Sequence, residues 1–131
     1  MTKIFADGAE ISEIIELNEN NVVEGFTTNP SLMRKAGIEN YESFSKEVLK
    51  IIGKKPISFE VFADEFDEME LQAKKISEWG ENVYVKIPIM NTKGLNSYEL
   101  IKKLSSKKIK LNITAILTFE QVDAIYKILD K

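Results

Sequence analysis

Short stretches in which apolar and polar residues alternate occur five times along the chain, and apolar residues spaced three or four apart follow them. Alternation is typical of half-buried strands, and the wider spacing is typical of amphipathic helices. Five strand-helix units in succession predict a parallel sheet with helices packed against it. The predicted strands are residues 3–7, 22–28, 57–63, 82–89 and 110–116. Apolar stripes predict helices around residues 11–15, 41–51, 69–76 and 100–104, and a last helix from the capping-box pair Thr118 and Gln121 to the end of the chain.

Polar side chains gather on one face of these strands, toward their C-terminal ends. In the fourth strand Val83, Val85 and Ile87 share one face and Lys86 lies on the other. The third strand repeats the arrangement, with Glu60 opposite a row of apolar residues. The polar residues near the ends of the remaining strands are Asp7, Thr27, Asn29, Asn112 and Thr114.

Two architectures accommodate five parallel units. A chain of 131 residues suits a complete doubly wound sheet, whereas a closed eight-stranded barrel takes about 250 residues. Central strands of a doubly wound sheet carry apolar residues on both faces, because helices cover both. Strands with one apolar and one polar face fit a barrel better, since the apolar face meets the outer helices and the polar groups converge at the mouth.

The composition limits the chemistry that is open to the chain. It has 44% hydrophobic and 30% charged residues, which predicts one soluble domain. The absence of Cys and His excludes thiol catalysis, Ser-His triads and the common zinc sites, so carboxylates, hydroxyls, amides and lysine remain. A net charge of -3, with lysines scattered among glutamates, argues against nucleic-acid and anionic-membrane partners. The sequence shows no N-terminal leader and no apolar run near ~20 residues, so we expect a cytoplasmic protein.

Taken singly, the polar strand residues have simpler structural explanations. Lys86 could be an edge residue whose ammonium group reaches water, or the partner of Glu60 in an ion pair. Asp7 and Asn29 could be turn or helix-cap residues. Their coincidence at one end of the sheet is harder to explain by stability, because buried polar groups are costly unless they are paired.

Five segments of the chain are distinctive in their order and spacing: IFADGAE, GFTTNPSLMRKAG, ISFEVFADEFDEM, NVYVKIP and LNITAILTFEQV. They resemble the first five strands of the small transaldolases, the family that includes fructose-6-phosphate aldolase. The resemblance implies an α/β fold, the (β/α)8 TIM barrel of the class I aldolases, of which this chain holds the first five βα units. It also implies transfer of a dihydroxyacetone unit between sugar phosphates in the pentose phosphate pathway, without a metal or an organic cofactor.

The resemblance assigns a role to each polar strand residue. Lys86 matches the lysine that forms a Schiff base with the ketose, and burial among apolar neighbours would favour the neutral amine that this attack needs. Asp7 matches the base that takes a proton from the hydroxyl group beside the breaking bond. Glu60 and Thr114 match a relay that positions water for imine formation and hydrolysis. The expected substrate-binding residues are Thr27, Asn29 and Asn112.

The resemblance ends after the fifth helix. We therefore expect residues 1–131 to be the N-terminal part of a single barrel domain: either a truncated gene product, or one half of a barrel whose remaining strands come from a second copy or a complementing chain. The family's later serine and arginine residues, which bind the substrate phosphate, therefore have no counterpart in residues 1–131. Arg34 is the only arginine in the sequence. Glu60 stands where the aldolase branch of the family tends to carry glutamine, which favours a transaldolase.

Three functions remain open from the sequence. The first is a Schiff-base transaldolase whose catalytic half is this chain, with aldolase-like cleavage of fructose 6-phosphate as a variant. The second is a fragment that folds or assembles without catalysis, which self-association through open sheet edges would favour. The third is a doubly wound phosphoacceptor domain. That class needs an aspartate at the end of the third strand and a lysine after the fifth, whereas here Glu60 ends the third strand and Lys86 lies in the fourth.

Overall fold

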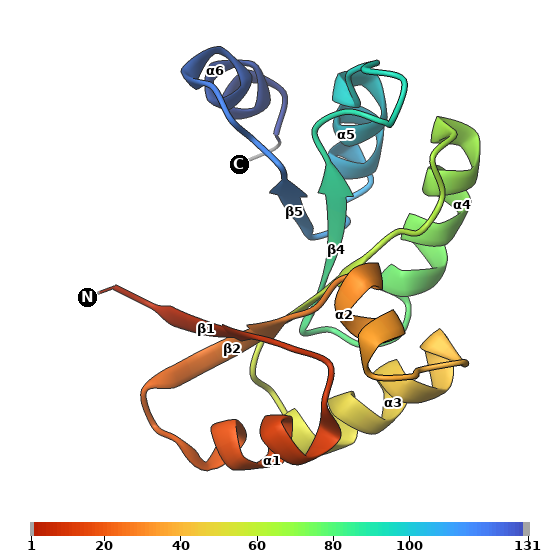
Figure 1. The fold of residues 1–131 in the computed structure, drawn as a ribbon. Coiled ribbons are helices and arrows are strands. Elements are labelled where there is room, and N and C mark those ends of the chain that lie inside the picture. The colour runs from red at the N-terminus through yellow and green to blue at the C-terminus, as the bar shows by residue number, and fades with distance from the viewer. Residues whose placement is uncertain (1, 130–131) are drawn as a thin grey trace.

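Five parallel strands form one curved sheet in the order β1-β2-β3-β4-β5, and Figure 1 shows helices arranged around its outer side. The structure is a computed structural model that describes residues 2–129, and no helix in that range is long and apolar enough to cross a membrane. The strands are β1 (Ile4–Asp7), β2 (Val23–Thr27), β3 (Ile57–Glu60), β4 (Val83–Pro88) and β5 (Leu111–Thr114). The helices are α1 (Ile11–Glu19), α2 (Pro30–Lys35), α3 (Tyr41–Ile52), α4 (Phe66–Ser77), α5 (Tyr98–Ser106) and α6 (Phe119–Ile128).

The strand order decides between the two architectures that the sequence left open. A doubly wound sheet reverses its direction of growth at a switch point, as in the order 2-1-3-4-5. Here each new strand pairs in parallel with the one before it and adds to the same side of the sheet. This is the construction of a barrel, and the five βα units form about half of one. The doubly wound alternative is excluded.

The hydrophobic core is a layer between the outer face of the sheet and the helices. Val83, Val85 and Ile87 of β4 are buried in this layer, and so are Ile57 and Phe59 of β3. Buried helix residues that pack in the same core include Val48, Met69, Ala73, Ile101 and Leu104. The alternation predicted from the sequence is confirmed, because the apolar positions of both strands form the core and leave the polar positions on the inner face.

Strand β3 ends at Glu60, three residues before its predicted end, because side chains bind the main chain that follows. The hydroxyl group of Tyr41 donates a hydrogen bond to the carbonyl oxygen of Glu60 at 2.8 Å. The amide groups of Phe62 and Ala63 both donate to Oε1 of Gln72, at 2.7 and 2.9 Å. These bonds direct the chain out of the sheet toward α4. The other strands end within two residues of their predicted limits.

Helix α2 was not predicted, although its boundaries carry ordinary signals. Asn29 caps it by accepting the Leu32 amide at 3.0 Å, and Pro30 occupies the first turn. Gly37 follows the helix with a φ of +71°, which a glycine adopts without strain. The helix has only six residues, which is too short to show an apolar period in the sequence.

Apolar side chains are exposed on the β1 edge of the sheet and in the segment that follows β5, the other edge strand. On β1, Ile4 and Phe5 are 49% and 45% exposed, and after β5, Leu117 and Phe119 are both 88% exposed. The strands between them are largely buried. Edge strands also carry backbone amide and carbonyl groups that have no neighbouring strand to pair with. Both edges therefore have the character of surfaces that another strand would cover.

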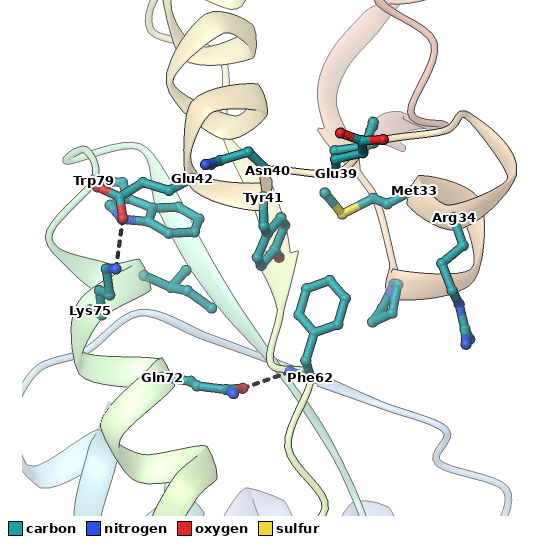
Figure 2. A pocket seen from close by; sticks show the side chains of 13 residues that line it. Met33, Arg34, Glu39, Asn40, Tyr41, Glu42, Phe62, Gln72, Lys75 and Trp79 are labelled. Atoms are coloured by element: carbon teal, nitrogen blue, oxygen red, sulfur yellow. Dashed lines mark hydrogen bonds and ion pairs between the residues drawn. The ribbon is translucent and has the colours of Figure 1, made fainter.

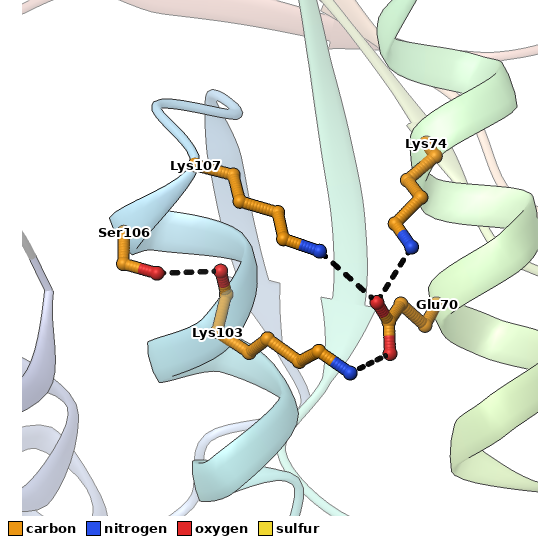
Figure 3. A network of polar contacts seen from close by, with 5 residues as sticks. All are labelled: Glu70, Lys74, Lys103, Ser106 and Lys107. Carbon is orange, nitrogen blue, oxygen red and sulfur yellow. Dashed lines mark hydrogen bonds and ion pairs between the residues drawn. The ribbon is translucent and has the colours of Figure 1, made fainter.

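Three lysines share the carboxylate of Glu70 and join α4 to α5 (Figure 3). Nζ of Lys74, one turn along α4, lies 2.7 Å from Oε1, and Nζ of Lys103 on α5 lies 2.6 Å from Oε2. Nζ of Lys107, just after α5, lies 3.3 Å from Oε1. Hydrogen bonds from Lys103 and Lys74 lower the pKa of Glu70 to about 2. The carboxylate is thus charged at neutral pH and holds the two helices together.

Gly25 of β2 lies where the chain passes very close to its neighbours. A Cβ atom at this position would overlap the ring of Phe5 and would lie 2.8 Å from the carbonyl oxygen of Pro56. That carbonyl is fixed, because it accepts the amide of Phe26 at 2.8 Å. The absence of a side chain at Gly25 therefore allows β1 and the start of β3 to approach β2 closely.

We expect Glu70→Gln to lower the melting temperature at neutral pH, because the lysines of the two helices lose the negative charge that they share. The pKa of Glu70 is about 2 in the folded chain, against an ordinary value of 4.5. The stabilising effect is therefore complete above pH 4.5 and is lost as the pH falls toward 2. Melting curves followed by circular dichroism should show the difference between wild type and variant closing over that range. Glu68→Gln, on the exposed side of α4, is the control, and a difference that persists at the acid end would contradict this role.

We expect Gly25→Ala to lower the free energy of unfolding by about 1–3 kcal/mol, because β1 or the Pro56 carbonyl must move to admit the methyl group. Gly8→Ala is a matched control, since the nearest atom to a Cβ there is Oε2 of Glu13 at an ordinary contact distance of 3.9 Å. Urea denaturation measures both variants. Equal stability of the two variants would show that the approach at Gly25 is not tight in solution.

Candidate active site

Lys86 lies on the inner face of the sheet, within reach of side chains from two other strands. Strand β4 pairs with β3 on one side and β5 on the other, so Lys86 is not an edge residue. Its Nζ lies 3.4 Å from Oγ1 of Thr27 and 3.9 Å from Oε2 of Glu60. The side chains of Lys86 and Glu60 are 13% and 18% exposed. The fold therefore brings the lysine, the glutamate and the threonine together in a largely buried place.

The register of the parallel ladder explains this convergence. Glu60 pairs with Lys86, and Lys86 pairs with Asn112 on the next strand. Paired residues in a sheet point to the same face, so the three side chains follow one another across β3, β4 and β5. On the first two strands, β1 and β2, Asp7 pairs with Thr27. Polar groups of five consecutive strands thus form two adjoining rows on the inner face.

Burial and charge both act on Glu60. Partial burial raises the pKa of its carboxyl group, the nearby charge of Lys86 lowers it, and the charge of Asp7 raises it. Burial is the largest of the three effects, and the net pKa lies above the ordinary value of 4.5. A carboxyl group with a raised pKa takes up a proton more readily near neutral pH. Glu60 is therefore suited to exchange a proton with a group or a water molecule beside Lys86.

Asn112 and Ser58 form a second polar pair on the inner face. Nδ2 of Asn112 donates to Oγ of Ser58 at 2.9 Å, across the width of β4. Both residues line a hollow of about 500 Å³, which we call the inner hollow, together with Phe5, Tyr84 and apolar residues of β5 and α6. The inner hollow adjoins the rows of polar side chains, so it offers room for a small molecule beside them.

The other predicted residues are placed less directly. Asp7 ends β1 and is exposed, and its link to Glu60 is through charge. Asn29 uses its side-chain oxygen to cap α2, which confirms the helix-cap role considered from the sequence. Thr114 ends β5, pairs with Pro88 and accepts the Ile89 amide through its main-chain oxygen at 2.9 Å. These three residues surround the C-terminal ends of the strands but do not join the contacts of Lys86.

Three residues of this region were not singled out by sequence reasoning. Ser58 shares its strand face with Glu60, so the same alternation that marks the glutamate also marks the serine. Tyr41 and Gln72 lie on helices and bind the main chain around Glu60. No local signal connects either of them to β3, because those contacts depend on how the helices pack. In residues 2–129, no group of three or more acidic side chains is placed to hold a metal ion.

A second hollow, of about 490 Å³, lies outside the sheet between α2, the start of α3 and α4 (Figure 2). We call it the outer hollow. Tyr41, Phe62 and Trp79 form an aromatic part of its wall, and Arg34 and Lys75 also line it. The sheet separates it from Lys86, so it is not part of the inner site, although Tyr41 connects the two through the Glu60 carbonyl.

Comparison with known proteins identifies relatives that match most of the chain. Residues 4–130 match the family model described as Transaldolase/Fructose-6-phosphate aldolase. A probable transaldolase of Streptococcus equi subsp. zooepidemicus is 41% identical over 119 residues, a match that covers 91% of this chain and 53% of that protein. Probable transaldolases of Thermoplasma volcanium and Dehalococcoides mccartyi are 42% identical over 125 residues and 38% identical over 119 residues. Those matches cover 94% and 91% of this chain, and 53% of each relative.

The chain spans about half the length of the curated relatives that it matches. This agrees with a structure of five βα units, which is part of a barrel. The family match and the strand order therefore describe the same portion of the fold. The chain belongs to the transaldolase and fructose-6-phosphate aldolase family.

Proposed function

We propose that this chain carries the Schiff-base site of a transaldolase, which transfers a dihydroxyacetone unit between sugar phosphates. The observation that carries the proposal is the place of Lys86, whose Nζ lies on the inner face of the half-barrel between Thr27 and Glu60. Family membership supports this chemistry. The relatives are about twice as long as this chain. Transaldolase activity is therefore proposed for a complete barrel that contains this chain.

In the proposed reaction the neutral amine of Lys86 attacks the ketone carbon of the donor sugar, and loss of water gives a protonated imine. The imine accepts the electron pair of the carbon-carbon bond that breaks, which leaves an enamine on Lys86 and releases the rest of the donor sugar as an aldehyde. Asp7, at the end of β1, takes the proton from the hydroxyl group beside that bond. The enamine then attacks the acceptor aldehyde, the proton returns, and hydrolysis frees Lys86.

Glu60 is the proton-exchanging group for imine formation and hydrolysis. Its separation of 3.9 Å from Nζ of Lys86 is longer than a direct hydrogen bond, and a water molecule or a substrate hydroxyl can be shared by such a pair. The raised pKa of Glu60 lets it hold a proton and return it. Thr114, on the same face at the end of β5, completes the relay in this proposal.

The three-carbon unit would be held by Thr27, Asn112 and Asn29. Thr27 contacts Lys86, and Asn112 on β5 is the residue that pairs with Lys86 in the sheet. Asn29 keeps its amide nitrogen for a ligand, since its oxygen caps α2. A glutamate at position 60 favours transfer over the simple cleavage carried out by aldolases of the family. Of these residues, Asn112 also lines the inner hollow.

Completion of the barrel is also part of the proposal. The edge strands β1, with the exposed Phe5, and β5 suit pairing with the strands that make up the rest of a barrel. A second copy of this chain or a complementing chain would supply them. A sugar phosphate also needs a cationic grip for its phosphate group, and Arg34 is the one arginine of the chain.

We expect the pKa of Glu60 to respond in opposite directions to two substitutions. Lys86→Met removes the positive charge that lowers it, so the pKa should rise further. Asp7→Asn removes the negative charge that raises it, so the pKa should fall. Carbon-13 NMR titration of glutamate carboxyl groups measures both shifts, with Glu60→Gln to assign the signal. Shifts in the same direction, or none, would contradict the charge coupling of these three residues.

Incubation with fructose 6-phosphate followed by borohydride reduction should leave a covalent dihydroxyacetone adduct on Lys86, detected by mass spectrometry of the modified peptide. Lys86→Arg should abolish the adduct, because arginine stays protonated and cannot attack a carbonyl. Lys46→Arg, at an exposed position of α3, should keep it. An adduct that persists in Lys86→Arg would overturn the assignment of the lysine. No adduct in a folded wild-type chain would show that imine formation requires the rest of the barrel.

A further inference from the structure

The end of strand β3 is held from outside the sheet by one side chain of α3. Tyr41 is the first residue of that helix, where Asn40 caps the first turn by accepting the Ser43 amide at 2.9 Å. The Tyr41 hydroxyl donates to the carbonyl oxygen of Glu60 at 2.8 Å. This bond connects the outer helix layer to the residue whose carboxylate faces Lys86 on the inner side.

Aromatic contacts fix the ring of Tyr41 in this position. Its centroid lies 6.1 Å from that of Phe59, 4.5 Å from that of Phe62 and 5.3 Å from that of Trp79. All three pairs are edge-to-face, with interplanar angles of 82°, 72° and 83°. Figure 2 shows Tyr41 between Trp79 and Phe62 at the wall of the outer hollow. A ring held by three neighbours keeps its hydroxyl directed at one carbonyl.

The hydroxyl group of Tyr41 remains a donor. Burial raises its pKa far above the ordinary value of 10, and the negative charge of Glu60 raises it further. The phenol is therefore protonated at neutral pH and remains a donor to the carbonyl oxygen of Glu60 while the Glu60 carboxyl group titrates. It is a constant support for a neighbouring carboxyl group that does titrate.

The main chain on the other side of Glu60 is also fixed. The Val61 amide donates to the carbonyl of Lys86 at 3.2 Å, and Gln72 accepts the two amides that follow. The side chains of Phe59 and Val61, on either side of Glu60, are buried in the outer core. Without the Tyr41 hydroxyl, a half-buried carbonyl would lose its partner, and the end of β3 would shift to recover one.

We propose that Tyr41 is a positioning residue for the site on the inner face: by binding the last carbonyl of β3 from the helix layer, it sets where the Glu60 carboxylate lies relative to Lys86. For catalysis, this inference rests on the proposed Schiff-base function. Nζ of Lys86 and Oε2 of Glu60 are 3.9 Å apart. At this separation a small movement of the carboxylate changes a direct ion pair into one that shares a water molecule, or the reverse. Misplacement by about 1 Å costs an enzyme up to ~100-fold in rate.

The test is Tyr41→Phe, which keeps the aromatic contacts and removes the hydroxyl. Tyr98→Phe is the matched control, since Tyr98 is likewise a half-buried tyrosine at the first position of a helix, α5. The groups that face Glu60 are Lys86 of β4, Asp7 of β1 and Tyr41 itself. We expect the pKa of Glu60, measured by carbon-13 NMR titration, to fall toward its ordinary value in Tyr41→Phe as the carboxylate gains solvent. In Tyr98→Phe it should not change.

A second measurement uses the rate of borohydride-trapped adduct formation on Lys86. Tyr41→Phe should slow trapping by about tenfold and move the acid limb of its pH profile in the same direction as the Glu60 pKa, while the final yield is retained. Trp79→Phe disturbs the packing behind the ring but keeps the hydroxyl, so it shows what lost stability alone does. All variants are compared at a temperature at which circular dichroism shows them folded.

The outcomes separate this inference from the proposed function. An unchanged Glu60 pKa in Tyr41→Phe would overturn the positioning role, whether or not the chain forms an adduct. The same shift in Trp79→Phe as in Tyr41→Phe would also overturn it, because packing would then be sufficient to explain the effect. Absence of any adduct on the wild-type chain would count against the activity of the chain alone, while the NMR titration would still decide the role of Tyr41.

Discussion

Burying the amine of Lys86 on the inner face of a parallel sheet is the constraint on which this structure depends. A cation taken out of water is costly unless polar or charged groups surround it. The ladder meets this requirement by register, because Glu60 stands beside Lys86 and Thr27 reaches it from β2. The separation of 3.9 Å from Glu60 is long for a structural ion pair, and that of 3.4 Å from the Thr27 hydroxyl group is long for a hydrogen bond, so the lysine is accommodated without being tightly bound. The proposed attack of this amine on a carbonyl carbon requires such an arrangement.

Alternation along each strand separates stability from chemistry. The outer positions, such as Phe59 and Val85, are fully buried against the helices and form the core. The inner positions carry the polar and charged groups that surround Lys86. A substitution on the inner face can therefore change the site with little effect on the core, whereas the outer layer fixes the strands on which the site stands. The Tyr41 bond to the Glu60 carbonyl is a point at which the two layers are joined.

The sequence was sufficient for features that depend on local patterns. The five strands, their buried faces and the barrel-like order follow from alternation and from the family resemblance, and the capping box of Thr118 and Gln121 is confirmed. The contacts that shape the site depend instead on residues far apart in the chain. Asn112 and Ser58 are separated by 54 positions, and Tyr41 and Glu60 by 19. No periodicity indicates such pairs, and the catalytic roles of Asp7, Thr114 and the others stay predictions.

The position of the site within the half-barrel separates two parts of the chemistry. Lys86, Glu60, Thr27 and Asn112 lie on β2 to β5, and the contacts among them are made within this chain. These contacts do not require strands beyond β5. In the proposed function, phosphate binding and exclusion of water from the inner face are different, because both depend on a closed barrel. In the proposed function, imine formation therefore depends on contacts within this chain, whereas selective transfer between sugar phosphates depends also on the rest of the barrel.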